Sequence, residues 1–107
     1  MIDLEQYIDR NGRNPFERWY ESLEAGTRAR IVGALDRLKR GSAAAKGVGS
    51  GVMEIRLDFG PGYRIYFGRD GETLVILLGG GTKRRQQLDI EATQHLWHEY
   101  KQRKRET

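Results

Sequence analysis

A glycine-proline turn followed by a strand with basic and aromatic side chains is the segment of this chain with the clearest capacity for chemistry. The segment reads Gly60-Pro61-Gly62-Tyr63-Arg64-Ile65-Tyr66-Phe67. Proline presets one turn dihedral and glycine accepts positive φ without steric cost, so the apolar runs on either side can fold back as a hairpin. Alternation along the strand then places Arg64 and Tyr66 on one face. The pattern predicts a functional surface on a small sheet.

Basic residues form two clusters outside this segment. One is Lys83-Arg84-Arg85, which follows three glycines, and the other is the C-terminal group Lys101, Arg103, Lys104 and Arg105. With a formal net charge of +4 and a pI near 9.6, the chain favours a polyanionic partner. Glycines allow backbone amides as well as side chains to approach phosphate, so the first cluster favours phosphate contact. The C-terminal cluster is explained equally well as solvated charge that maintains solubility.

Composition limits the kinds of site and location to be expected. A chain of 107 residues is one domain, residues 1–107, with one core and a basic tail at about 101–107. It has no cysteine and only two histidines, His95 and His98, which we interpret as surface or helix-packing residues, so we expect no metal and no cofactor. The longest apolar run, Leu74 to Leu78, is too short to cross a bilayer, and the first residues lack the features of a secretory signal. We therefore expect a cytoplasmic protein without a membrane partner.

Apolar spacing predicts the elements that must position these residues. They are an opening strand from Ile2 to Ile8, a helix from about Pro15 to Leu23 capped by Asn14, a helix capped by Thr27 and closed by Gly41, strands at 52–59, 63–67 and 73–78, and a terminal helix from about Asp89 to Arg103. The glycine-rich and alanine-rich stretch from Gly41 to Gly51 has too little to bury, so it is expected to loop over the surface.

Turn lengths predict how the strands pair. We expect Gly60–Gly62 to form a three-residue loop and Asp70-Gly71 a two-residue turn. The resulting pairs on the face of Arg64 are Asp58 with Arg64, Arg56 with Tyr66, Tyr66 with Val75, and Arg64 with Leu77. Because that face mixes charged and apolar side chains, the terminal helix or a partner protein should cover part of it. In this register Arg64 can also be explained as a cross-strand ion pair with Asp58.

The combination of early helices, a hairpin with Gly-Tyr-Arg and a basic segment after the last strand resembles a known family. It is similar to the RelE/ParE/HigB superfamily of toxins from type II toxin–antitoxin modules, and within it to the short, phage-associated addiction module killer proteins. The residues that carry the resemblance are Glu54–Leu57, Gly60–Phe67, Leu77–Lys83 and Asp89-Ile90, and the similarity runs from about Phe16 to Trp97. It implies a RelE-like α+β fold, with two N-terminal helices packed on a small, mainly antiparallel twisted sheet of about four strands and a C-terminal helix.

The resemblance also implies an activity and a set of site residues. Several members of the superfamily are metal-independent, ribosome-dependent mRNA endonucleases that block translation. Attack by a 2′-OH on the adjacent phosphate needs a base, a stabiliser of charge on phosphorus and a proton for the leaving oxygen. By resemblance the catalytic residues are Arg64, Arg56 and Lys83, and the RNA-binding residues are Tyr66, Arg84, Arg85 and Tyr63. Glu54 and Asp89 depart from the family pattern, because a basic residue and an aromatic acid or base are often found at those places.

Partners and alternatives follow from the same resemblance. The expected partners are a cognate antitoxin, itself a helix-turn-helix protein, the ribosome with its mRNA, and operator DNA reached through the antitoxin complex. Two other functions stay open at this point. The chain can be a non-enzymatic inhibitor of DNA gyrase of the ParE type, or a degenerate member that only binds its antitoxin.

Overall fold

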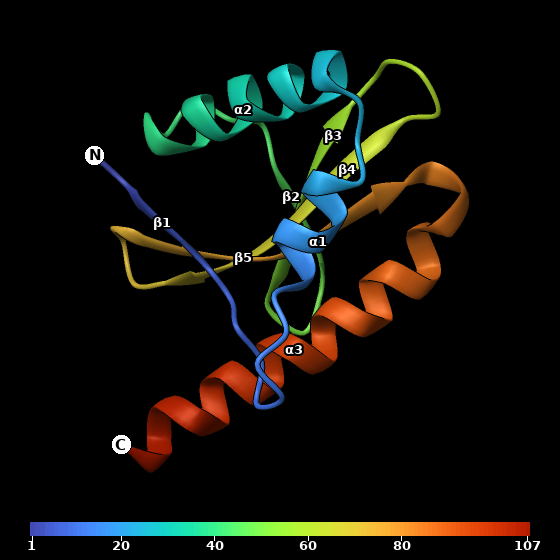
Figure 1. The fold of residues 1–107 in the computed structure, drawn as a ribbon. Helices are drawn as coiled ribbons and strands as arrows, with labels where there is room; N and C mark the ends of the chain where they lie inside the picture. The colour runs from blue at the N-terminus through green and yellow to red at the C-terminus, as the bar shows by residue number, and fades with distance from the viewer.

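The computed structural model describes all residues, 1–107, and shows an α+β fold with helices on both sides of one five-stranded sheet (Figure 1). The elements are β1 (Asp3–Gln6), α1 (Pro15–Glu21), α2 (Ala25–Lys39), β2 (Lys46–Gly49), β3 (Val52–Leu57), β4 (Tyr63–Asp70), β5 (Leu74–Thr82), the 3₁₀ turn η1 (Lys83–Arg85) and α3 (Gln86–Glu106). The strand order is β1-β5-β4-β3-β2, with β1 parallel to β5 and the other neighbours antiparallel.

The sheet has one strand more than the sequence predicted. The expected surface loop between Gly41 and Gly51 contains β2, which pairs with β3 from Lys46 opposite Glu54 to Gly49 opposite Val52. Weak apolar content hid this strand, because only Val48 packs against a core and the pairing is made by backbone. A short strand at the edge of a sheet needs few apolar side chains of its own.

Two apolar cores lie on opposite faces of the sheet. The first joins α1 and α2 to the sheet through Phe16, Ile31, Leu38, Ile65 and Phe67, among others. The second lies under α3 and contains Tyr7, Val52, Tyr66, Ile76, Leu78 and Trp97. In Figure 1, α2 and α3 lie on opposite sides of the sheet. Of the two covers predicted for the second face, the terminal helix and a partner protein, the structure shows the terminal helix.

The ends of the helices agree with the capping signals at some places and not at others. Asn14 caps α1 as predicted, since its side chain accepts a hydrogen bond of 3.0 Å from the Glu17 amide and Pro15 takes the first helical position. The second helix begins at Ala25, before the predicted cap at Thr27. The terminal helix is longer than predicted at both ends, so the basic tail is helical as far as Glu106.

Close packing and polar contacts hold α3 on the sheet. Trp97 lies so near β4 that a Cβ at Gly68 would come within 2.5 Å of its indole ring. Near the C-terminus, Arg103 Nη1 donates 2.7 Å to the carbonyl of Ile8 and Lys104 Nζ donates 2.6 Å to Asp70. Part of the basic C-terminal cluster thus holds α3 against β1 and the β4–β5 turn.

Pairing of β3 with β4 differs from the prediction by two residues. Leu57 lies opposite Tyr63 and Arg56 lies opposite Arg64, so the connecting loop has five residues, Asp58 to Gly62. The loop tightens at two glycines with positive φ, Gly60 at 53° and Gly62 at 75°. A shift of two residues keeps every side chain on its face. It removes the predicted pairing of Asp58 with Arg64, and the explanation of Arg64 as one half of that ion pair is wrong.

Pairing of β4 with β5 differs from the prediction by an odd number of residues, so side chains at the start of β5 lie on the face opposite to the one predicted. Asp70 lies opposite Leu74, so the turn has three residues rather than two, and a register shift lies near Leu78. Val75 and Leu77 pack in the first core, and Ile76 packs under α3. The prediction that Val75 and Leu77 share a face with Arg64 is wrong, because an odd change in register turns each side chain to the other face.

Candidate functional site

Four polar side chains form a cluster between the sheet and the first turns of α3, three of them buried and Asp89 partly exposed. They are Glu54 on β3, Arg64 and Tyr66 on β4, and Asp89 on α3. Arg64 is 2% exposed and Tyr66 is 0% exposed, so the cover predicted for part of this face extends over both of these site residues. Each of the four has a buried atom without a hydrogen-bond partner: Glu54 Oε1, Arg64 Nε, Tyr66 Oη and Asp89 Oδ2. Such orphaned atoms are costly, so their gathering at one place marks a candidate site.

Only part of this cluster is satisfied by hydrogen bonds. Gln86 Nε2 donates 2.7 Å to Glu54 Oε2, and Arg64 Nη1 donates 3.0 Å to the carbonyl of Gly62. The cluster also depends on a glycine, because a Cβ at Gly81 would lie 1.9 Å from Asp89 Oδ2. The run of glycines at the end of β5 therefore gives α3 room to bring a carboxylate against the sheet.

Burial raises the pKa of two groups in this cluster, the Tyr66 phenol and the Asp89 carboxyl. Burial raises the pKa of the Tyr66 phenol, and the nearby carboxylates of Glu54 and Asp89 raise it further. Burial also raises the pKa of Asp89, against the opposing effect of Arg85, whose Nε lies 3.9 Å from Asp89 Oδ1. Tyr66 is consequently a neutral hydrogen-bond donor near pH 7, and Asp89 takes up a proton more readily than an ordinary aspartate.

The basic turn η1 lies directly beside Arg64. The carbonyl of Gly62 accepts both from Arg64 and, at 2.7 Å, from the backbone amide of Lys83. Lys83, Arg84 and Arg85 are all exposed. Arg56 is exposed too and lies opposite Arg64 on β3. The structure thus brings Arg56, Arg64 and Lys83 to one end of the sheet, with Arg64 buried and the other two accessible.

Tyr63 does not join the other predicted RNA-binding residues. It lies on the opposite face of β4 from Arg64 and Tyr66, where it is half-buried against the first core. Its ring centroid is 5.1 Å from that of Phe59, in the β3–β4 loop. Residues two apart on a strand share a face, whereas Tyr63 and Arg64 are neighbours and point to opposite faces.

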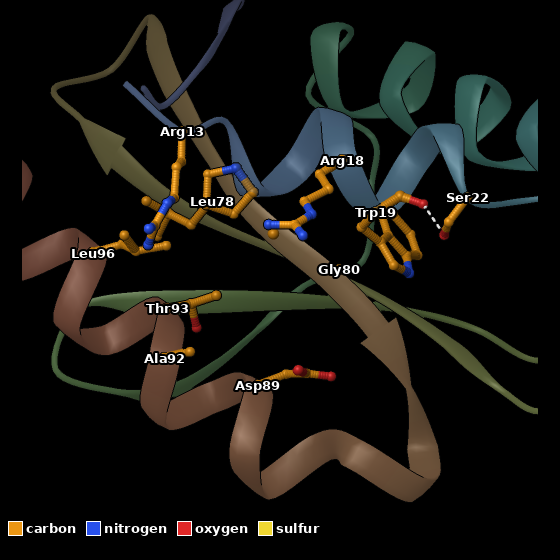
Figure 2. Close-up of a pocket in the computed structure, with 12 residues that line it drawn as sticks. Arg13, Arg18, Trp19, Ser22, Leu78, Gly80, Asp89, Ala92, Thr93 and Leu96 are labelled. Atoms are coloured by element: carbon orange, nitrogen blue, oxygen red, sulfur yellow. Dashed lines mark hydrogen bonds between the residues drawn. The ribbon is translucent and has the colours of Figure 1, made fainter. Parts of the chain in front are cut away.

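A groove of about 390 Å³ opens next to the cluster, between α1 and α3. Its lining residues are Arg13, Pro15, Arg18, Trp19, Ser22, Leu78, Gly79, Gly80, Asp89, Ala92, Thr93 and Leu96. Figure 2 shows Arg13 and Arg18 reaching in from the α1 side and Asp89 projecting from α3. A Cβ at Gly80 would lie 2.2 Å from the Trp19 ring, so Trp19 lies against the backbone of β5.

The sequence analysis did not identify Arg13 and Arg18 as site residues. Neither belongs to a basic cluster in the sequence, and they reach the groove only because α1 crosses β5. The available signal was the run Gly79-Gly80-Gly81, since consecutive glycines in a strand indicate close approach by other groups.

The two histidines lie away from the cluster. His95 and His98 are exposed on α3, beside Glu91 and Lys101, so their interpretation as surface residues is confirmed for both. No group of three or more histidine, aspartate or glutamate side chains is arranged to hold a metal ion. No helix combines the length and apolar character needed to cross a membrane.

Comparison with known proteins places the chain in a family. A family model described as "Phage derived protein Gp49-like (DUF891)" matches residues 18–101, which include the polar cluster and η1. A Haemophilus influenzae protein that carries the name "Uncharacterized protein" is 37% identical over 86 residues, covering 78% of this chain and 87% of that protein. The chain therefore belongs to the Gp49-like family of phage-derived proteins, a family associated with toxin–antitoxin modules.

Proposed function

We propose that this protein is the toxin of a type II toxin–antitoxin module and that it is an endoribonuclease, cutting mRNA on the ribosome without a metal. Family membership supports the toxin–antitoxin context. The observation that carries the proposed activity is the meeting of Arg56, Arg64 and Lys83 at one end of the sheet. The resemblance to the RelE/ParE/HigB superfamily assigns the same three residues to catalysis.

The charges at this end of the sheet suit cleavage of RNA by its own 2′-OH. The transition state places extra negative charge on phosphorus, which guanidinium and ammonium groups stabilise. In the proposal Arg64 performs this task, with Arg56 and Lys83 beside it. Arg84 and Arg85 are exposed on the adjoining turn, where they can hold flanking phosphates. Tyr66 is assigned to contact with the RNA as a neutral donor or a stacking surface, which requires its buried side chain to become accessible.

Access to Arg64 is a condition of this mechanism. Its guanidinium is buried, with Nη1 bonded to the Gly62 carbonyl beside η1, and the hydrogen bond from Gln86 to Glu54 joins the start of α3 to β3 on the same face. Direct contact between Arg64 and a phosphate therefore requires this start of α3 to shift. The proposed partners are the ribosome with its mRNA and a cognate helix-turn-helix antitoxin, through which operator DNA is bound.

Burial of Arg64 favours a second candidate function. An arginine that is 2% exposed can serve structure alone, and a toxin of the ParE type inhibits DNA gyrase without needing an exposed catalytic residue. A member that only binds its antitoxin needs none either. The exposed turn Lys83–Arg85 then contacts the protein partner instead of RNA.

Brief expression followed by mapping of mRNA 5′ ends tests the proposal. Wild type is compared with Arg64→Ala, with Lys83→Ala as an exposed second variant that should fold normally, and with Arg40→Ala as a control. Arg40 is an exposed arginine at the C-cap of α2 that forms an ion pair with Asp36. Codon-phased cuts that persist in Arg40→Ala and are lost in the other two variants support the nuclease. Intact messages together with cleaved DNA linked to gyrase would refute it.

A further inference from the structure

Three arginines line a cleft on the other side of the sheet end, between α2 and the β3–β4 loop. The cleft has a volume of about 380 Å³, and its lining residues are Arg30, Gly33, Arg37, Arg56, Leu57, Asp58 and Phe59. Arg30, Gly33 and Arg37 are three and four residues apart on α2, so they share one face of the helix. The middle residue, Gly33, has no side chain, so the space between the two arginines is open. A Cβ at Gly33 would have only Arg37 Nη1 nearby, at 3.8 Å.

None of these arginines is neutralised within the protein. Arg30, Arg37 and Arg56 take part in no ion pair, although five ion pairs form elsewhere in the chain. Asp58 is the one acidic residue that lines the cleft, so the cleft has a net positive charge. Unpaired guanidinium groups around a concave surface are suited to a phosphate, which they bind through paired, charge-assisted hydrogen bonds.

Aromatic side chains form one wall of the cleft. The guanidinium of Arg30 lies over the ring of Phe59, 4.4 Å from its centroid, and the Phe59 ring packs against Tyr63. A nucleobase can stack on a guanidinium plane or an aromatic ring, provided that the base is not already stacked inside a duplex. This wall therefore favours a single strand over a double helix.

The cleft continues into the basic turn η1. Arg56 and Leu57 end β3 opposite the start of β4, and Tyr63 in turn lies opposite Thr82, the residue before Lys83. In Figure 1 the β3–β4 loop and the turn between β5 and α3 lie at the same end of the sheet. Basic side chains thus run around this end from α2, through Arg56, to Lys83–Arg85.

We infer that the cleft formed by Arg30, Arg37 and Arg56 is a second phosphate-binding site, and that it holds the backbone of single-stranded RNA. The inference rests on the proposed function for the choice of RNA as the polyanion. Phosphates lie between Arg30 and Arg37, one base stacks on the pair of Arg30 and Phe59, and the strand continues past Arg56 toward η1.

Binding of a short fluorescein-labelled single-stranded RNA, followed by fluorescence anisotropy at several salt concentrations, tests this site. The variant is the pair Arg30→Gln and Arg37→Gln. The control is the pair Arg28→Gln and Arg40→Gln, which makes the same change in net charge in the first turn and at the C-cap of the same helix, outside the cleft. We expect the cleft variant to bind about tenfold more weakly and to lower the salt slope by about 1.4, because each phosphate contact to a single strand contributes about 0.7. The control should bind like wild type.

Three results would overturn the inference: wild-type affinity in the cleft variant, an equal loss in the control, or tighter binding of a DNA duplex than of the RNA. Failure of the proposed function gives a different pattern. If messages stay intact in cells while the purified protein binds RNA through Arg30 and Arg37, the nuclease is refuted and the site stands. If messages are cut in a manner that depends on Arg64 while RNA affinity does not change in the Arg30 and Arg37 variant, the site is refuted and the nuclease stands.

Discussion

Replacing Tyr66 by phenylalanine should make the protein more stable. The Tyr66 side chain is 0% exposed and its hydroxyl has no well-formed hydrogen bond, so folding removes that hydroxyl from water with at most a weak contact to Glu54 in return. A buried polar group in this condition costs about 1–3 kcal/mol. Phenylalanine keeps the ring and its packing in the second core and removes only the orphaned oxygen. We therefore expect Tyr66→Phe to increase the free energy of unfolding by about 1–3 kcal/mol.

Thermal and urea unfolding, followed by circular dichroism, can measure an effect of this size. An unfolding entropy of about 2.1 cal/mol/K per residue over 107 residues means that each kcal/mol moves Tm by about 4 °C. The matched control is Tyr100→Phe, since the Tyr100 hydroxyl donates a hydrogen bond to Asp70. Losing that bond should reduce the free energy of unfolding by about 0.5–1.5 kcal/mol. The two substitutions are chemically identical and should have opposite signs.

A loss of stability in Tyr66→Phe would refute the reasoning. It would mean that the hydroxyl is satisfied within the cluster, by Glu54, Arg64 or an enclosed water, and that the cluster is a structural network. A gain in stability together with a loss of mRNA cleavage would instead show that Tyr66 is kept for function at a cost in stability, as is common at active sites.

Three further predictions concern packing and pH. Gly80→Ala should lower the free energy of unfolding by about 1–3 kcal/mol, because the new Cβ would lie 2.2 Å from the Trp19 ring. The control is Gly26→Ala, where the new Cβ would have nothing within 4 Å. An equal loss of stability in both variants would contradict the packing argument. Hydrogen bonds from α3 lower the pKa of Asp70 in the folded protein, so Asp70→Asn should cost about 0.5–1 kcal/mol at pH 7, with the cost fading as pH falls below the ordinary value of 3.8. Burial raises the pKa of Asp89, so Asp89→Asn should stabilise the protein at pH 7, with the gain fading as pH falls toward 3.8. Urea unfolding between pH 3 and 7 measures how the free energy of unfolding of each variant differs from wild type. If the two differences had the same sign and the same pH dependence, both predictions would be contradicted.

Local signals in the sequence were sufficient for most of the elements. The cap at Asn14, the alternation of β3 and β4 and the spacing of α3 each depend on neighbouring residues, and each was predicted from them. β2 was missed because its pairing with β3 uses backbone groups that every residue has. The faces of the β5 residues from Leu74 to Leu77 were exchanged because the turn before them has one residue more than the prediction allowed. A register shift near Leu78 changes the pairing again toward the end of the strand.

For the candidate site too, some features follow from the sequence and others only from the tertiary structure. The sequence by itself determined which chemical groups are present and, through strand alternation, that Arg64 and Tyr66 share a face with Arg56. Only the tertiary structure decided that α3 buries that face, that the guanidinium of Arg30 lies over Phe59 on the other side, and that Arg30 and Arg37 meet Arg56 at one cleft. The physical reason is the range of the interactions. Periodicity and capping act within a few residues, whereas burial and ion pairing depend on which distant segments pack together, and turn length and register set that packing.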